Sequence, residues 1–596
     1  MPALNPGGNE LMREVEGGQA VAHASRTTWF WWAGCAATFL AIVICRMEVL
    51  AMPPYWDAAI GLWPEAILLV ESDFDYRRLL FTEPTFRQGG FATYQISLMP
   101  TLLALCMRFL PTVTSVIVLY HLFTMACATA IAAGMFAILR ATVDAGTAAL
   151  CCLACLTTPL LCTQIDMVAM ELPMTACAVV ASACMLQNRL NWTAAAALLS
   201  FLMKPTGLLV TTVLVGLATL RLIVAWRTIP LARPRVDVPG VVSLWLSWGI
   251  QFTLVLLVKW RDLVDVSTEE VYNFRAAIYW CPDVLLLFAG VAMLVGCQGI
   301  WRLAALRSIS GWSARWRRAC TLVRGAIFEP PIVLVAGLIA LAAFAACYNL
   351  LFLPRYLVIA VPFVYLTLCV LLVAPSARTK PARMLLASIV VINLVNWNGI
   401  LFPSLERSIE RHFGISGASL AREGSLLERS HEYLPDHRAN IAAARRLAEE
   451  CAEQPIFAGL PFNYFLSFPA LGYVSEPLRG YSIAGYNRTF AGFRRIEEVL
   501  IDPPRDPVFV SAGNSSYRFF AWFDVPLCGP GDHVVYCDNS PSPLVVFEKR
   551  WQSQPSIDDL RAWYRDRLLT EDSATESDPV PAARSEALPA APQVVR

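Results

Sequence analysis

The stretch PPYWDAAIGLW, residues 53–63, follows directly on the apolar run TWFWWAGCAATFLAIVICRMEVLAM, residues 28–52. A run of about 20 apolar residues is long enough to cross a bilayer as a helix. Asp57 is the one carboxylate of PPYWDAAIGLW, and it stands where the chain should leave the membrane. A charge at that depth is costly unless it reaches water or a partner inside the protein, so the rest of the chain decides what Asp57 does.

The composition of the chain is that of a membrane protein. Hydrophobic residues make up 57% and charged residues 16%, with a mean hydropathy of +0.52, whereas a soluble domain carries about 25% charged residues. We therefore predict an integral membrane protein that has the lipid bilayer as a partner. The 47 Lys and Arg against 46 Asp and Glu leave a net charge of +1. This net charge is too small to attract a polyanion such as nucleic acid, and no nucleic-acid partner is expected.

The sequence contains no motif for a metal or an organic cofactor. Most of the 18 cysteines lie in apolar runs, where they act as small hydrophobes, and Cys152 and Cys155 have no second pair to complete a zinc site. No glycine-rich phosphate loop, HExxH or Ser-His-Asp pattern is present. We predict no structural metal site and no cofactor, and a requirement for a divalent metal stays open.

Charge bias along the chain predicts the topology. The apolar runs fall at 28–50, 93–110, 113–139, 146–164, 171–186, 191–203, 206–226, 239–258, 283–301, 331–351, 356–374 and 384–402. Lys and Arg concentrate in segments that such bias keeps in the cytoplasm, around Arg140, Arg189, 221–235, 302–324 and 378–383. These segments share one side only if the run 93–110, which carries Pro100 and Arg108, lies in the membrane interface. About eleven transmembrane helices are then expected.

This topology divides the chain into four parts. Residues 1–27 form a cytoplasmic N-terminal segment, and residues 28–403 form the transmembrane domain with a first outer loop at 51–112. Residues 404–566 are expected to be a small extracytoplasmic α/β domain, and residues 567–596, rich in Ala, Pro, Ser and Glu, to be disordered. The protein is therefore expected in the plasma or inner membrane.

Short strand-like runs interleaved with a helical run support the α/β prediction for residues 404–566. Strands are expected within QPIFAGL (454–460), DPVFVSAG (506–513) and PSPLVVFEKR (541–550), and a helix within ANIAAARRLAEECAE (439–453). Whether Cys528 and Cys537 form a disulfide is left open, and such a bond requires that this domain lies in an oxidising compartment.

The first outer loop is predicted to lay two helices on the membrane surface before the chain returns to the bilayer. Ala58, Leu62, Ala66 and Leu69 recur at helical spacing within 57–92, which favours an amphipathic helix. Gly89 and Gly90 allow a turn before the second helix, which begins in GGFATYQISLMP, residues 89–100.

In this order of elements the chain resembles the GT-C glycosyltransferases that use lipid-phosphate sugars, such as protein O-mannosyltransferases and lipid A aminoarabinose transferases. The resemblance covers roughly residues 28–402. It implies a GT-C-like fold and an inverting transfer of a sugar from a polyprenyl-phosphate donor to a lipid, glycan or protein acceptor on the outer face. Asp57 takes the place of the acid that opens the family's first outer loop. Ala58 stands where the family often has a second acid, and Tyr94 and Gln95 replace a proline-pair motif.

Two acids at the next outer turn are candidates for the same site. QIDMVAMELPMT places Asp166 and Glu171 close together, and Glu171 in ELP matches the acid that the family sets before a helix. Helix capping is the simpler interpretation of either acid. In the functional interpretation, Asp57 is the catalytic base and Glu171 is an acid that assists it. Asp166 is then a candidate for substrate contact.

Two cations at outer helix ends are candidates for binding the donor phosphate. Lys204 in FLMKPTGLL and Arg355 in LPRYLVIAVPF both stand near a proline at an outer turn, as they do in the resembling family. Snorkelling and anchoring to lipid headgroups, with Tyr356 in an aromatic belt, are the alternatives. We assign Lys204, Arg355 and Tyr356 to the phosphate, and Tyr94 and Arg87 to substrate contact.

A transporter or a flippase for lipid-linked sugars is the rival interpretation, because charges at helix ends could also line a translocation path. Such proteins are often built from inverted repeats with interrupted half-helices, and no paired segments of that kind stand out in the sequence. A non-catalytic scaffold that displays the C-terminal domain would leave the buried charges without a purpose.

Overall fold

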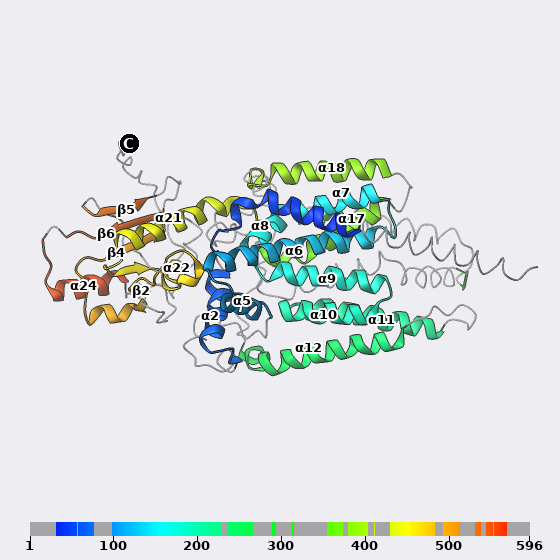
Figure 1. The fold of residues 1–596 in the computed structure, drawn as a ribbon, viewed down its shortest axis with the longest axis horizontal. Helices are drawn as coiled ribbons and strands as arrows, with labels where there is room; N and C mark the ends of the chain where they lie inside the picture. Colours follow the sequence, from blue (N-terminus) through cyan, green and yellow to red (C-terminus); the bar gives the residue numbers. More distant parts are fainter. Residues whose placement is uncertain are drawn as a thin grey trace, which may run out of the picture.

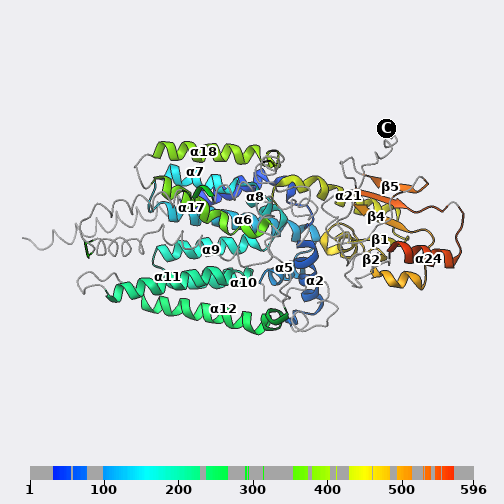
Figure 2. The same cartoon turned by 180° about the vertical axis from the view of Figure 1, so that it is seen from behind.

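Helices form most of the computed structural model, and a small mixed sheet occupies one end of it (Figure 1). The structure describes residues 31–55, 58–76, 98–227, 237–265, 354–373, 379–402, 429–459, 461–482, 493–512, 531–537, 544–551 and 553–568, with a few single or short stretches between them. Seen from behind, the sheet again lies beyond one end of the helices (Figure 2). The molecule therefore has a helical part and a sheet domain, which meet at one end.

The helices of the helical part follow the apolar runs closely. Their bounds are α6 Val113–Leu139, α7 Ala145–Leu156, α8 Pro159–Met167, α9 Glu171–Leu186, α10 Leu190–Met203, α11 Gly207–Arg227, α12 Val238–Asp265, α17 Ala360–Val373 and α18 Thr379–Val395, after a first helix at Trp31–Cys45. Side-chain caps begin three of them, and at the start of α12 Asp237 accepts a hydrogen bond from the amide of Gly240 at 3.1 Å. Thr112 accepts a hydrogen bond from the amide of Ser115 at 3.1 Å, and Asp144 accepts one from the amide of Thr147 at 3.1 Å.

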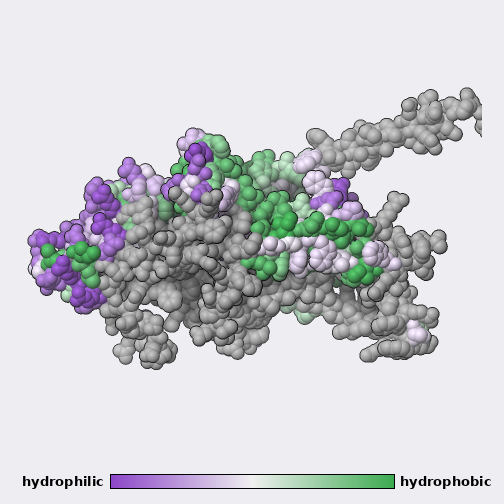
Figure 3. All heavy atoms as spheres, turned by 90° about the horizontal axis from the view of Figure 1, so that it is seen from below, coloured by the Kyte–Doolittle hydropathy of each residue, from purple (hydrophilic) through white to green (hydrophobic). Residues whose placement is uncertain are grey.

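Two of the described helices, Val113–Leu139 and Val238–Leu256, are long and apolar enough to cross a membrane, and a third span results if α7 and α8 are taken together. Large apolar side chains point outward from the helical part: Trp192, Trp226, Leu246 and Met384 are each more than 60% exposed. Figure 3 shows hydrophobic residues over the helical part and hydrophilic ones over the sheet domain. This surface fits a membrane-embedded helical part. The total of about eleven spans stays a prediction, because the run 331–351 lies outside the described residues.

The apolar run 146–164 does not form one continuous helix. The chain bends by 62° between α7 and α8. Pro159 begins α8, and a proline disfavours the helical conformation in the residue before it. Thr158 accordingly has φ −59° and ψ 125°. Asn393 of α18 donates to the carbonyl of Ala154 at 2.9 Å, which satisfies one acceptor near the break.

The described part of the first outer loop lies at the junction of the helical part and the sheet domain (Figure 1). A π-helical turn, η2 Ala58–Leu62, leads into α2 Trp63–Glu71, and α5 Leu98–Phe109 packs against α2. The four residues expected on one helix face, Ala58, Leu62, Ala66 and Leu69, are all buried. The described residues of α5 number 12, fewer than the roughly 20 of a spanning helix, and its interfacial position stays a prediction.

The sheet domain contains the predicted strands. Its order is β3-β2-β1-β4-β6-β5, with β1 Ile456–Ala458, β2 Gly480–Ser482, β3 Phe493–Arg495, β4 Val508–Ala512, β5 His533–Cys537 and β6 Leu544–Glu548. The first four in that order run parallel, and β6 pairs antiparallel with β4 and β5. The expected strands β1, β4 and β6 and the expected helix, α21 Leu434–Glu450, are confirmed, whereas β2, β3 and β5 were not foreseen.

Alternating side chains give the sheet two apolar faces. Phe457, Phe509 and Phe547 pack with Tyr564 of α24 Ile557–Leu568 on one face. Their neighbours along the strands, such as Ile456, Val508 and Val546, point to the face that α21 covers. Cys528 and Cys537, for which a disulfide was left open, are both exposed thiols in the structure.

A substitution at Gly480 tests the parallel pairing of β1 and β2. A Cβ at this position would overlap the carbonyl oxygen of Ile456, its register partner. Gly480→Ala should therefore lower the free energy of unfolding of the sheet domain by about 1–3 kcal/mol, the usual cost of overpacking. Thermal unfolding in detergent would measure the difference, with Gly531→Ala as the control, because no described residue lies within 4 Å of a Cβ placed at that position. Equal midpoints for the two variants would contradict this packing.

Candidate functional site

Three ionisable residues selected from the sequence meet inside the helical part. Glu171 is the first residue of α9, Lys204 caps the C-terminus of α10, and Arg355 lies in the 3-10 turn η4 Pro354–Leu357, ahead of α17. Their exposed fractions are 3%, 7% and 6%. The structure therefore joins residues from three separate segments into one buried cluster.

Local sequence explains why Lys204 leaves its helix. Pro205 follows it, and the residue before a proline is pushed toward extended backbone. Lys204 has φ −155° and ψ 132° at the end of α10. Since α10 packs along α9, the side chain that leaves the end of α10 reaches the start of α9, where Glu171 lies.

One carboxylate oxygen holds both cations. The Nζ atom of Lys204 donates to Oε1 of Glu171, and Nε of Arg355 lies 3.2 Å from the same oxygen. Because Oε1 is engaged by two cations, Glu171 acts as their anchor. Its role as an acid that assists Asp57 stays a prediction.

Two side-by-side cations are suited to an oxyanion ligand. Arginine and lysine bind phosphate through charge-assisted hydrogen bonds, with arginine adding a planar fork of donors. Taking charges out of water costs several kcal/mol per ion, so a buried cluster of this kind is weak evidence for stability. Charged groups among membrane helices point first to function.

The cluster lies beside elements of the first outer loop. The helix α5 of that loop packs against α10, and η4 packs against α8. Asp57, Arg87 and Tyr94 lie outside the described residues, so their predicted roles stay predictions. Tyr356 lies in η4 next to Arg355.

Asp166 belongs to a second buried cluster, separate from the first. Its Oδ1 accepts from Nε of Arg46 at 2.9 Å, and its Oδ2 lies 2.6 Å from Nε2 of His431 and also bonds Nη2 of Arg46. Asp166 and His431 have side chains with 0% exposure. Asp166, expected to contact substrate, thus has both oxygens engaged by protein groups.

An aromatic ring completes the second cluster. The guanidinium of Arg46 lies 5.2 Å from the ring centre of Trp397, and His431 stacks on the same tryptophan at 5.2 Å and 14°. His431 precedes α21 of the sheet domain, whereas Arg46 follows the first helix and Asp166 lies in the last turn of α8. The cluster therefore ties the sheet domain to the helical part.

Burial, with the Arg46 guanidinium beside it, lowers the pKa of His431 to about 3. The imidazole is consequently neutral at physiological pH, and it joins the Arg46–Asp166 pair without adding a charge. A third buried charge would be expensive in such a place.

Backbone strain separates the two acids. Val168, between Asp166 and Glu171, has φ 58° and ψ 38°, a left-handed conformation that a β-branched residue rarely adopts. Strain of this kind costs about 1–3 kcal/mol and is found at functional sites. The turn sends the two neighbouring carboxylates into different clusters.

Sequence reasoning missed Arg46, His431 and Trp397. Arg46 carried a usable signal, since it is an arginine at the end of an apolar run. His431 and Trp397 carried none, because their partner is distant in the chain. Among the described residues, no group of three or more His, Cys, Asp or Glu side chains is arranged to hold a metal ion.

The chain matches no family model and no curated protein. Among solved structures it is similar to the crystal structure of ArnT from Cupriavidus metallidurans in the apo state, with 14% sequence identity and a TM-score of 0.47, over 87% of this chain and 98% of that one. At this identity and score the likeness carries no functional argument, which must come from the residues themselves.

Acidification tests the state of His431. A histidine in the unfolded chain has a pKa of about 6.5, whereas the pKa of His431 in the folded protein is about 3. As the pH falls from 6.5 toward 3, the unfolded chain therefore binds a proton that the folded protein does not, and the free energy of unfolding decreases. Between pH 7 and pH 5 the expected loss is about 2 kcal/mol from this group. Thermal unfolding in detergent at both pH values should show a smaller acid-induced drop for His431→Gln than for the wild type.

His533→Gln is the control, because His533 lies in the same domain with a side chain 49% exposed. It should keep the acid-induced drop of the wild type. If His431→Gln loses as much stability on acidification as the wild type, His431 is not held neutral in the fold.

Proposed function

We propose that this protein is a membrane glycosyltransferase that moves a sugar from a polyprenyl-phosphate donor to an acceptor hydroxyl at the membrane face beside the sheet domain. The observation that supports this most is the buried cluster of Glu171, Lys204 and Arg355 next to elements of the first outer loop. It supplies two cations where a lipid phosphate would enter from the bilayer.

The donor phosphate is bound by Lys204 and Arg355 in this mechanism, with Tyr356 beside them. Negative charge accumulates on the phosphate as the bond between it and the sugar breaks, and fixed cations stabilise that charge. Glu171 keeps the two cations oriented before the substrate arrives, so little reorganisation is needed during the reaction. Glu171 is therefore a positioning residue.

Asp57 is the proposed catalytic base. The acceptor oxygen attacks the anomeric carbon, its proton passes to the Asp57 carboxylate, and polyprenyl phosphate leaves with the electrons of the broken bond. Attack from the face opposite the leaving group inverts the anomeric centre. Two features support this role. Charge bias predicts that Asp57 opens the first outer loop, and the π-helical turn Ala58–Leu62 follows it in the chain, a feature that often marks functional sites.

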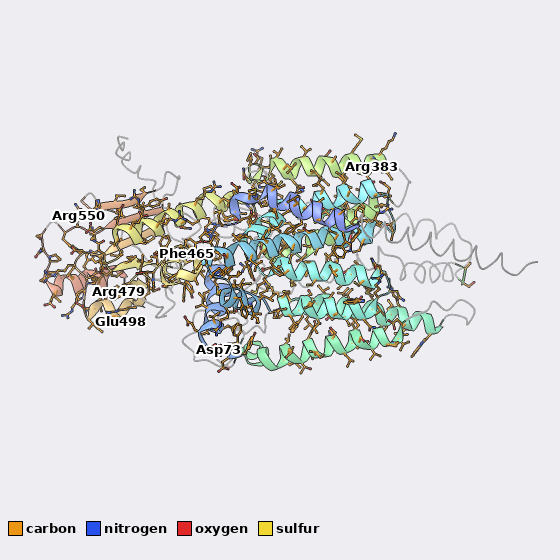
Figure 4. The ribbon with its side chains drawn as sticks, in the orientation of Figure 1. Asp73, Arg383, Phe465, Arg479, Glu498 and Arg550 are labelled. Atoms are coloured by element: carbon orange, nitrogen blue, oxygen red, sulfur yellow. The ribbon has the colours of Figure 1, made fainter. Side chains whose placement is uncertain are left out.

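The proposal also includes the membrane orientation from the charge bias, with the sheet domain outside the cytoplasm and the basic segments inside. Figure 4 labels Arg383 at the end of the helical part away from the sheet domain, and this arginine pairs with Asp144 at 2.5 Å. Arg383 belongs to one of the segments expected in the cytoplasm. Its position fits the proposed orientation.

Asp57→Asn tests the catalytic role directly. With purified protein in lipid vesicles and a radiolabelled sugar on polyprenyl phosphate, the variant should lose at least about a hundredfold in rate, as expected when a general base is removed. Asp144→Asn is the control, because Asp144 lies with Arg383 and asparagine also caps helices. Wild-type rates in Asp57→Asn would remove the residue from this role. No transfer from any donor by the wild type, together with flux of lipid-linked sugar across the vesicles, would favour the flippase.

Arg355→Lys tests the phosphate contact. Lysine keeps the charge but loses the fork of donors and shortens the reach, so kcat/KM for the donor should fall about tenfold to hundredfold. Arg383→Lys is a matched control, because Arg383 also pairs with one carboxylate but lies at the other end of the helical part. Equal donor kinetics for both variants would exclude Arg355 from phosphate binding.

A further inference from the structure

The segment before Asp57 is held between the helical part and the sheet domain. Pro53, Pro54 and Tyr55 are all buried, and the exposed fraction of Tyr55 is 1%. Neither proline has an N–H to donate, so regular backbone pairing cannot hold this segment, and its carbonyls depend on side chains from outside.

A hydrogen-bond chain from the sheet domain ends on this segment. The hydroxyl of Tyr473 donates to the carbonyl of Pro54 at 2.9 Å, and Nε2 of His437 lies 3.0 Å from the same hydroxyl. Tyrosine has a single hydroxyl hydrogen, which Pro54 receives, so His437 must be the donor to Tyr473. The two hydrogen bonds therefore run in the same donor-to-acceptor direction, from His437 of α21 to the Tyr473 hydroxyl and from that hydroxyl to the carbonyl of Pro54.

Aromatic rings of the sheet domain surround Tyr55. Its ring centre lies 4.6 Å from His437, 5.4 Å from Tyr433 and 6.5 Å from Phe465. Phe465 stacks on Tyr473 at 4.1 Å and 10°, and Figure 4 labels it at the junction. The same residues therefore fix both the ring of Tyr55 and the hydroxyl that binds Pro54.

The helical part holds the segment from the other side. Nε2 of His121, in α6, lies 3.2 Å from the carbonyl oxygen of Met52. Gly472, next to Tyr473, has φ 82°, and a Cβ there would press on Ile117 of α6 and approach Pro53. Only glycine allows the sheet domain to come this close to α6 in that conformation.

We propose that the sheet domain is a positioning element of the transfer reaction, in which Tyr473, oriented by His437, fixes the Pro54 carbonyl and thereby the direction in which the chain presents residue 57. This inference rests on the proposed function, in which Asp57 is the base. A base displaced by about 1 Å can lose about a hundredfold in rate. The sheet domain then contributes to the rate without contacting the reacting atoms.

Tyr473→Phe is the sharpest variant, because it removes only the hydroxyl and keeps the stacking on Phe465. Its matched control is Tyr564→Phe, since Tyr564 is also buried in the sheet domain and its hydroxyl also donates to a proline carbonyl, that of Pro504, at 2.9 Å. Both variants lose one hydrogen bond of the same kind and should unfold at similar temperatures. Only Tyr473→Phe loses the contact with the segment before Asp57.

Transfer kinetics with the labelled donor give the first readout. Tyr473→Phe should lower kcat about tenfold to hundredfold while KM for the donor changes less than about twofold, because Lys204 and Arg355 are untouched. Tyr564→Phe should keep both constants. A general loss of stability would affect both variants alike.

Hydrogen exchange gives a second readout that does not need activity. Amides in peptides covering residues 55–60 should exchange faster in Tyr473→Phe than in Tyr564→Phe or the wild type. If either the exchange of these peptides or kcat in Tyr473→Phe equals that of Tyr564→Phe, the inference is overturned. If the wild type transfers no sugar, the proposed function fails, and the exchange measurement alone then shows whether Tyr473 orders the segment before Asp57.

Discussion

Charges buried among apolar helices must find their partners inside the protein, and this constraint organises the molecule. Glu171 holds Lys204 and Arg355, and Asp166 holds Arg46 beside the neutral His431. Each cluster joins segments that are far apart in the chain, so each fixes where helix ends meet. The left-handed turn at Val168 lets two acids five positions apart serve different clusters.

The two clusters differ in what they can do. The Asp166 cluster joins a cation and an anion with a neutral imidazole under a tryptophan, which suits a permanent link between the helical part and the sheet domain. In the Glu171 cluster one carboxylate oxygen serves two cations. This difference supports a structural role for the Asp166 cluster and the proposed phosphate-binding role for the Glu171 cluster. The proposed reaction thus depends on a site held by one cluster and a domain junction held by the other.

Hydrophobic patterning predicted many elements well. The runs 113–139 and 171–186 coincide with α6 and α9. Three strands and α21 lie where short strand-like runs and a helical run placed them. The break at Pro159 was missed because apolar composition continues through it. The short strands β2, β3 and β5 were also missed, since segments of 3 to 5 residues carry too little periodicity to stand out. Lys204, Glu171 and Arg355 were selected as charges at outer helix ends that match the resembling family, and they were expected at one site. That Glu171 pairs with both cations was not predicted.

Sequence alone established that this chain belongs in a membrane, where its longer helices lie, and which few charges are expensive enough to need an explanation. Each of these properties is local, because hydropathy and helix breaking by proline are carried by neighbouring residues. The tertiary structure decided which acid pairs with which cation. It also decided that Tyr473, with His437 beside it, binds the backbone carbonyl of Pro54. Such pairings depend on which helix ends and turns meet in space, and no property of the separate segments specifies that.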